Sequence, residues 1–133
     1  MKMNKKGFTL VELLAIIVIL AIIAVITVPI VLNVIENSRK GAARSSALGY
    51  VDAIKLAYME RYAGINEEGT NVDFQISGVT QTTPLKVNKE GAGVVCSGVN
   101  FTATGTLEIA SCTATVNGKD YVFHTYTNGS FAD

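Results

Sequence analysis

An apolar run of twenty-five residues, Phe8 to Leu32, constrains the fold of this chain more than any other feature. The run contains one charged side chain, Glu12, and residues 13–26 show no polar face at the helical period of 3.6 residues. An α-helix rises about 1.5 Å per residue, so a helix of this length crosses a hydrocarbon layer roughly 30 Å thick. The sequence therefore predicts a membrane-spanning helix over 8–32.

The charges on either side of the run indicate its orientation. The residues before it are basic (Lys2, Lys5 and Lys6), whereas the cations after it are offset by an acidic residue (Arg39, Lys40 and Arg44 with Glu36). Positive charge favours the cytoplasmic side, so we expect the short tail inside and the rest of the chain outside. A secretory signal peptide would have a shorter apolar region followed by a small-residue cleavage site, which this sequence lacks.

The remaining composition excludes several classes of protein. Eleven Lys and Arg balance eleven Asp and Glu, and the chain has one His and two Cys. No basic excess is available to neutralise phosphates, so no specific nucleic-acid binding is predicted. No nucleophile is joined by a base and an orienting residue, and no CxxC or HExxH motif occurs. We expect no enzyme, no cofactor and no metal site.

The start of the apolar run carries the most specific motif, KKGFTLVE over 5–12. It resembles the processing site of type IV prepilins and pseudopilins, with a basic leader ending in Gly7, Phe8 as the first mature residue and Glu12 as the fifth. The resemblance implies a leader peptide over 1–7 that prepilin peptidase removes between Gly7 and Phe8 on the cytoplasmic side. The peptidase then methylates the new amine of Phe8 and leaves the helix on the mature protein. Pro29 falls where such proteins usually carry a helix-breaking proline.

Glu12 needs a partner for a physical reason as well. An unpaired carboxylate near the end of a membrane span costs several kcal/mol. Cleavage before Phe8 would create a positive amine, and a neighbouring subunit could offer that amine to Glu12, which would also set the register between subunits. The alternative is a plain anchor in which Glu12 reaches the membrane surface.

Pro29 also has two interpretations. Its ring clashes with the carbonyl group four residues earlier, so it should kink the helix or open it locally near Val25 and Ile26. In an anchor this is incidental. In a bundle of packed helices it allows the helix to bend or melt during assembly, because neighbours shield the freed backbone groups. Thr27 can also donate a hydrogen bond to a backbone carbonyl.

Beyond Leu32 the helix continues with one apolar face. Apolar residues recur at helical spacing and predict an amphipathic half over 33–63 that ends at Gly64: Ala43, Ala47, Tyr50, Val51, Ile54, Tyr58 and Tyr62. We expect this face to pack on the domain that follows rather than on a partner. The loop 66–71 and Asp73 offer oxygen ligands to calcium, but their spacing is not that of an EF-hand, and a solvated acidic loop is the simpler interpretation.

After Val72 the period changes to two, which predicts strands over 72–76, 85–87, 94–96 with an extension through 101–104, and 106–116. Asn117-Gly118 predicts a hairpin to a strand over 119–123. In that register one face is apolar and the other polar: Cys112, Ala114, Val116, Tyr121 and Phe123 against Thr113, Thr115, Asp120 and His124. The fold class is therefore α+β, a long N-terminal helix on a small antiparallel sheet, type IV pilin-like by resemblance. Residues 64–133 form the globular head with 33–63.

Cys96 and Cys112 leave two possibilities open. A disulfide would close a loop of about sixteen residues, worth roughly 3 kcal/mol in the chain-entropy model, and would resemble the bridges of many pilins. The alternative is two reduced, half-buried thiols on separate strands.

The resemblance implies a structural subunit of a type IV pilus, used in adhesion, twitching motility or DNA uptake. Such a subunit spans the inner or cytoplasmic membrane once with its head outside, in contact with lipid, and then joins a cell-surface or periplasmic filament. Its partners would be like subunits, prepilin peptidase and the pilus assembly machinery. The alternatives are a pseudopilin of a type II secretion or competence system, and a single-span membrane-anchored binding protein or minor adhesive pilin.

Overall fold

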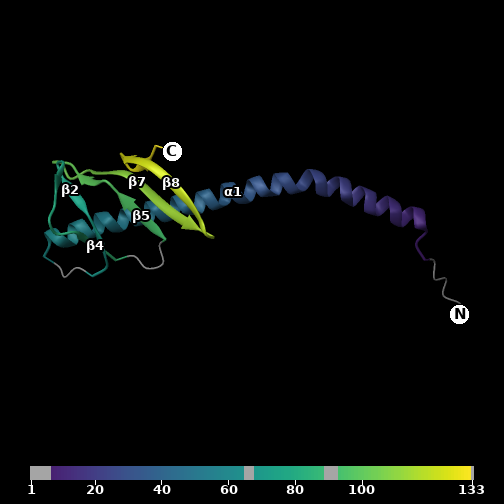
Figure 1. Ribbon diagram of the computed structural model, residues 1–133, viewed down its shortest axis with the longest axis horizontal. Coiled ribbons are helices and arrows are strands. Elements are labelled where there is room, and N and C mark those ends of the chain that lie inside the picture. The colour runs from purple at the N-terminus through teal and green to yellow at the C-terminus, as the bar shows by residue number, and fades with distance from the viewer. Residues whose placement is uncertain (1–6, 65–67, 89–92, 133) are drawn as a thin grey trace. The chain divides into compact units, whose positions relative to one another are not determined.

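A computed structural model describes residues 7–64, 68–88 and 93–132 (Figure 1). The chain divides into two compact units, which we name the apolar unit, Met1–Ser38, and the head unit, Arg39–Asp133. The elements are one helix and nine strands within the described residues: α1 Leu10–Tyr62, β1 Thr70–Val72, β2 Phe74–Ile76, β3 Val79–Thr80, β4 Leu85–Val87, β5 Val94–Ser97, β6 Val99–Phe101, β7 Leu107–Val116, β8 Lys119–Thr127 and β9 Ser130–Phe131.

Helix α1 ends where the sequence predicts. Ala63 donates its N–H to the carbonyl of Met59 at 3.0 Å, and Gly64 donates to the carbonyl of Arg61 at 3.1 Å. Gly64 adopts φ +72°, a left-handed conformation that glycine reaches without the steric cost of a Cβ atom. This conformation turns the chain out of the helix, so the prediction of a stop at Gly64 is confirmed.

The apolar unit contains the first part of α1. Within the described residues, one helix is long and apolar enough to cross a membrane; its most apolar window has a mean hydropathy of 3.3, and none of that window is buried inside the chain. The helix continues through Pro29, so no local opening interrupts it near Val25 and Ile26, and the predicted kink stays a prediction. Thr27 Oγ1 donates to the carbonyl of Ile23 at 2.6 Å, which confirms the expected contact with the backbone.

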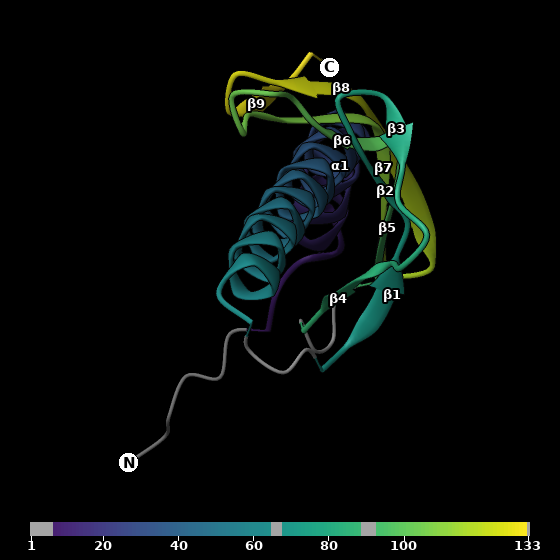
Figure 2. The same ribbon diagram turned by 90° about the vertical axis from the view of Figure 1, so that its left-hand side faces the viewer.

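The head unit builds its core between one face of α1 and the strands (Figure 2). The predicted apolar face is buried from Ala43 to Ile54, and Ala57 extends it. Tyr58 is half-buried, with its ring stacked on Phe101 at 3.8 Å between centroids. Tyr62 is 71% exposed. Its assignment to the core is therefore wrong, because its ring packs edge-on against Tyr58 at 4.9 Å, outside the cluster.

The sheet is mixed rather than purely antiparallel. The larger sheet has the order β3-β2-β6-β7-β8-β9, with β5 also paired to β7, and β1 pairs with β4 in a separate two-stranded sheet. Strands β2 and β6 run parallel, which is the departure from the prediction. The strand predicted over 72–76 is also interrupted at Asp73, because β1 and β2 pair with different partners. Strand β3 lies between the segments 72–76 and 85–87, where the sequence predicts no strand.

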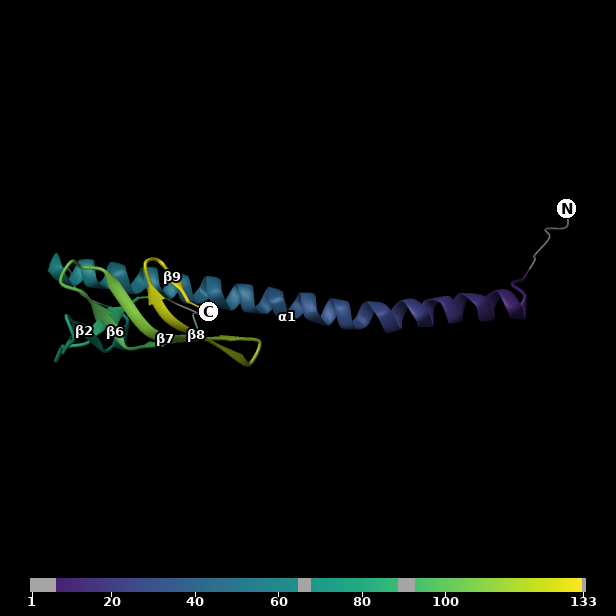
Figure 3. The same cartoon turned by 90° about the horizontal axis from the view of Figure 1, so that it is seen from above.

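The long hairpin of β7 and β8 forms as predicted (Figure 3). Asn117 and Gly118 have φ values of +51° and +78°, as a two-residue turn with both central residues left-handed requires. Cys112 faces Phe123 and Ala114 faces Tyr121 in the register, and these four side chains are buried. On the opposite face, Thr115 Oγ1 donates to Asp120 Oδ1 at 2.6 Å.

The alternation of buried and exposed side chains is interrupted at the same level on three neighbouring strands. We name the three residues at this level the phase-shift line: Gly98, Ala110 and Thr125. Strands β5 and β6 pair with β7 in one register that is interrupted at Gly98 and Val99. Gly98 has φ +67° and Thr125 has φ +51°. On each strand the burial alternation slips here by one residue, leaving two consecutive positions turned away from the core: Ser97 and Gly98, Ala110 and Ser111, His124 and Thr125. Because the alternation shifts at the same level on all three strands, the buried side chains on both sides of the phase-shift line face α1.

Candidate functional site

The predicted processing bond lies in non-helical chain. Gly7, Phe8 and Thr9 precede α1, and the Phe8 side chain is 81% exposed. The helix begins at Leu10 rather than at Phe8, so the Gly7–Phe8 peptide bond is outside its hydrogen-bond ladder. The predicted leader residues Met1–Lys6 lie outside the described residues.

Glu12 has partners within its own chain. Thr9 donates its N–H to Glu12 Oε2 at 3.1 Å, and Glu12 donates its N–H to Thr9 Oγ1 at 3.2 Å. These two bonds form a reciprocal capping box, which satisfies two donors that a helix N-terminus otherwise leaves unpaired. The negative carboxylate also lies at the positive end of the helix dipole. The T-x-x-E spacing that signals this cap is present in the sequence, but the two roles predicted for Glu12, pairing with a neighbouring subunit or reaching the membrane surface, did not include it.

The two cysteines form a disulfide in the structure. Cys96 on β5 faces Cys112 on β7 directly, with 4.0 Å between their Cα atoms. Cys112 is buried and Cys96 half-buried. The bridge thus fastens β5 to the central strand of the sheet, two residues before the break at Gly98.

Two of the residues in the calcium hypothesis, Asn66 and Glu67, lie outside the described residues. Within the part of the chain that the structure describes, no group of three or more His, Cys, Asp or Glu side chains is placed to hold a metal ion.

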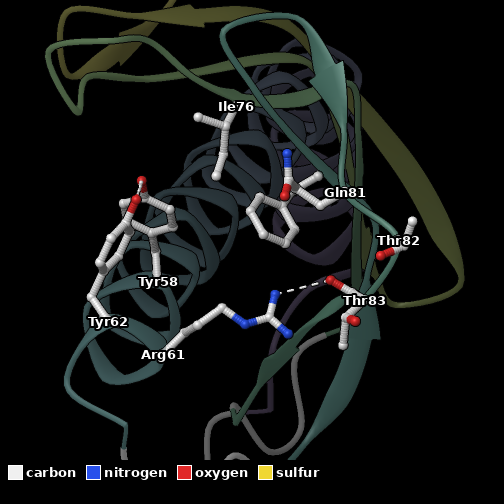
Figure 4. Close-up of a pocket in the computed structure, with 8 residues that line it drawn as sticks. Tyr58, Arg61, Tyr62, Ile76, Gln81, Thr82 and Thr83 are labelled. Atoms are coloured by element: carbon white, nitrogen blue, oxygen red, sulfur yellow. Dashed lines mark hydrogen bonds between the residues drawn. The ribbon is translucent and has the colours of Figure 1, made fainter.

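A pocket of about 460 Å³ lies beside the C-terminal end of α1 (Figure 4). It is lined by side chains from α1, from β2 and from the segment after β3: Tyr58, Arg61, Tyr62, Phe74, Ile76, Gln81, Thr82 and Thr83. Arg61 Nη1 donates to the carbonyl of Thr83 at 2.9 Å, and its guanidinium carbon lies 5.4 Å from the centre of the Phe74 ring. These contacts hold the guanidinium across the pocket.

Tyr58 and Tyr62 form another wall of this pocket. Tyr58 donates its hydroxyl to the Tyr62 hydroxyl at 3.2 Å. This hydrogen bond, followed by burial, raises the pKa of Tyr58 to about 12, so the Tyr58 hydroxyl is neutral at physiological pH. The pocket therefore combines aromatic surface with hydroxyl, amide and guanidinium groups. Sequence reasoning missed it, although the Tyr58–Tyr62 spacing of one helical turn was visible.

Comparison with known families identifies the N-terminal segment. Residues 2–28 match the family described as the prokaryotic N-terminal methylation motif. No curated protein and no solved structure matches the chain. The chain therefore carries the prepilin-type cleavage and methylation motif of type IV pilins and pseudopilins, on a pilin-like α+β fold with one long N-terminal apolar helix. This motif implies, in general, processing by prepilin peptidase and assembly into filaments, and the helix is compatible with the single-pass anchor typical of pilins.

Proposed function

We propose that this chain is a structural subunit of a type IV pilus, cleaved by prepilin peptidase and assembled into a surface filament through its N-terminal helix. The observation that carries the proposal is the Thr9–Glu12 capping box, which lies directly after the Gly7–Phe8 bond at the head of an apolar helix. The processing bond, the charge and the anchor thus occupy one short segment.

Processing is the first step. A peptidase needs access to the scissile peptide group, and the exposed, non-helical chain at Gly7 and Phe8 provides it. Hydrolysis of this bond releases the basic leader and leaves a free amine on Phe8, which the same peptidase methylates. The apolar helix remains on the mature subunit, which stays anchored in the cytoplasmic or inner membrane with its head outside.

Storage in the membrane is the second step. A carboxylate near the end of a span is costly unless it accepts hydrogen bonds. In the single chain Glu12 accepts the N–H of Thr9. The capping box therefore reduces the cost of keeping this charge at the membrane before any neighbour is present.

Assembly is the third step. The assembly machinery brings apolar helices from like subunits together, and the amine of Phe8 on one subunit approaches Glu12 on the next. Charge pairing in a low-dielectric bundle fixes the axial register, because a subunit one position out of place leaves two unpaired charges. Pro29 gives the bundled helix a position at which it can bend or melt.

Substitutions of Glu12 test this proposal. Glu12→Ala removes the cap and the charge, whereas Glu12→Gln keeps a capping side chain, since Gln serves in capping boxes, and removes only the charge. Both variants should be cleaved as the unmodified chain is, and neither should yield filaments in sheared fractions viewed by electron microscopy. Normal filaments from Glu12→Gln would show that charge pairing does not drive assembly.

A pseudopilin of a type II secretion or competence system would share the same motif. The two roles differ in the amount of filament on the cell surface. A pilus subunit should dominate the protein of sheared filaments, and mass analysis of that fraction should find the chain without residues 1–7 and with a methyl group on Phe8. Absence of the chain from abundant filaments would favour a pseudopilin.

A second candidate is a binding protein, either anchored by a single span or acting as a minor adhesive pilin. The pocket of Tyr58, Arg61 and Tyr62 favours it, because aromatic walls with converging polar groups are typical of ligand sites. Intact mass separates the anchored form from a pilin, since a plain anchor keeps its leader and gains no methyl group.

A further inference from the structure

The sheet opens into a fork between two of its strands. Strands β2 and β6 pair in parallel, with Phe74 opposite Val99. Continuing that register toward the N-terminal ends would pair β1 with β5, but β1 pairs with β4 and β5 with β7. The two arms therefore separate at Asp73 and Gly98. We name residues 70–73 and 94–98 the strand fork.

Both sides of the strand fork are strand edges, and among the described residues the facing edges of β1 and β5 have no strand partner. A strand has two edges; β1 uses one for β4, and β5 uses one for β7. Among the described residues, no backbone hydrogen bond joins 70–73 to 94–98. The carbonyl of Gly93 accepts the N–H of Thr115 at 2.8 Å. Because antiparallel pairs alternate, Val94 and Cys96 direct their N–H and C=O groups away from β7 and into the fork.

A cavity of about 410 Å³ fills the space between the arms. Its lining is the strand fork itself, with Tyr50 of α1 as a floor: Thr70, Asn71, Val72, Asp73, Val94, Val95, Cys96, Ser97, Gly98 and Tyr50. Tyr50 is 6% exposed and belongs to the core, so the floor is fixed by packing. The cavity is thus bounded on two sides by backbone and below by an aromatic side chain.

We propose that the strand fork binds an extended segment of a partner polypeptide, which inserts as a strand between β1 and β5. The occupant is a polypeptide because only its backbone offers donors and acceptors at the spacing of both edges. The edges are three and four residues long, so the inserted segment has three or four residues. The charged side chain that the described lining residues contribute is Asp73, which favours Lys or Arg in the partner at the closed end of the fork.

The proposal is independent of the pilus role, and amide exchange on the full chain tests it. The isotope-labelled chain in detergent micelles is titrated with acetylated, amidated pentapeptides Thr-X-Thr-X-Thr, in which X is Val, Ile or Lys. At least one peptide should slow hydrogen exchange at the amides of Val94 and Cys96 by about tenfold or more, because these donors gain partners. The amide of Phe131 on β9, which β7 and β8 separate from β5, serves as the internal control and should not change.

Two matched controls separate strand insertion from other binding. The same peptide with N-methyl groups on alternate residues loses donors along one edge and should give no protection. Asp73→Asn should weaken the Lys peptide and leave the Val peptide unchanged, and an unaltered spectrum of the core amides shows that this variant is folded. The proposal is overturned if no peptide protects Val94 and Cys96, or if the N-methylated peptide protects them equally. Protection that grows with the concentration of the chain alone would also contradict it, because a second copy would then fill the fork.

Discussion

Gly98→Ala should be among the most destabilising single-methyl additions in the head unit. Gly98 lies on the phase-shift line with φ +67°, and a Cβ atom there would lie 2.5 Å from the Cβ of Ala110 on β7. Two separate costs therefore arise, one from the left-handed backbone and one from the overlap of two methyl groups.

The magnitude follows from these terms. A left-handed conformation costs an L-residue roughly 1–2 kcal/mol, while replacing Gly reduces the entropy of the unfolded chain and returns about 0.5–1 kcal/mol. Overpacking adds about 1–3 kcal/mol. The free energy of unfolding should therefore fall by roughly 1–4.5 kcal/mol. Gly105→Ala is the matched control, because Gly105 has φ +85° with nothing within 4 Å of its Cβ position; it should lose at most about 1.5 kcal/mol.

Denaturant unfolding of the full chain in detergent, followed by the near-ultraviolet circular dichroism of its tyrosines, measures these differences. A double-mutant cycle isolates the overlap, since Ala110→Gly removes the methyl group that Gly98→Ala would strike. In the Ala110→Gly background, Gly98→Ala should no longer carry the free-energy cost of the overlapping methyl groups. Only the cost of the left-handed backbone should remain. The reasoning is refuted if Gly98→Ala costs no more than Gly105→Ala, or if Ala110→Gly brings no recovery.

Three further predictions concern the hydroxyl pair, the disulfide and the helix cap. Tyr62→Phe removes the acceptor for Tyr58, so the pKa of Tyr58 should fall from about 12 toward its ordinary 10.0 in a titration of labelled tyrosine rings by NMR. Because the folded pKa is the higher one, the stabilisation from this pair is complete below about pH 10 and disappears as the pH rises toward 12; an unchanged pKa in the variant would contradict this origin. Reducing the Cys96–Cys112 bridge should lower the free energy of unfolding by roughly 3 kcal/mol, measured by denaturation with and without reductant, and equal stability would refute the entropic argument. Thr9→Ala should speed amide exchange in the first turn of α1 by an amount equivalent to about 1 kcal/mol, with Thr9→Ser as the control that retains the cap.

The parts of the fold that the sequence predicts correctly depend on neighbours along the chain. The apolar face of α1 repeats at helical spacing, and Gly64 stops the helix through its own left-handed backbone. Asn117-Gly118 is similarly local, because both residues tolerate positive φ and together fix the register of β7 and β8. Such features need no knowledge of distant segments.

The errors arise where distant strands decide the outcome. Thr125 lies in β8 beyond the strand predicted over 119–123. It is β-branched and has φ +51°, a conformation that such residues avoid, so nothing in its own sequence predicts it. Its position opposite the slips at Ala110 and Gly98 explains the exception. The parallel pairing of β2 with β6 joins segments far apart in sequence, and the pattern of either strand alone gives no sign of it.

The candidate sites also differ in whether their residues are neighbours in sequence or are brought together by the fold. Gly7, Phe8 and Glu12 belong to one contiguous motif, so the sequence alone places them together. Arg61 joins the segment after β3 only because the sheet brings Thr83 beside the end of α1, and no spacing in the sequence encodes that contact.

The capping box at Thr9 and Glu12 has a thermodynamic consequence for the proposed filament. Since the carboxylate already accepts a hydrogen bond within its own chain, its pairing with a neighbour's amine is an exchange of partners, and the net gain is the difference between two favourable states. The cap therefore lowers the net free energy that charge pairing contributes to each contact between subunits in the proposed filament. In the proposed filament, a subunit that leaves its neighbours can form the Thr9–Glu12 capping box again.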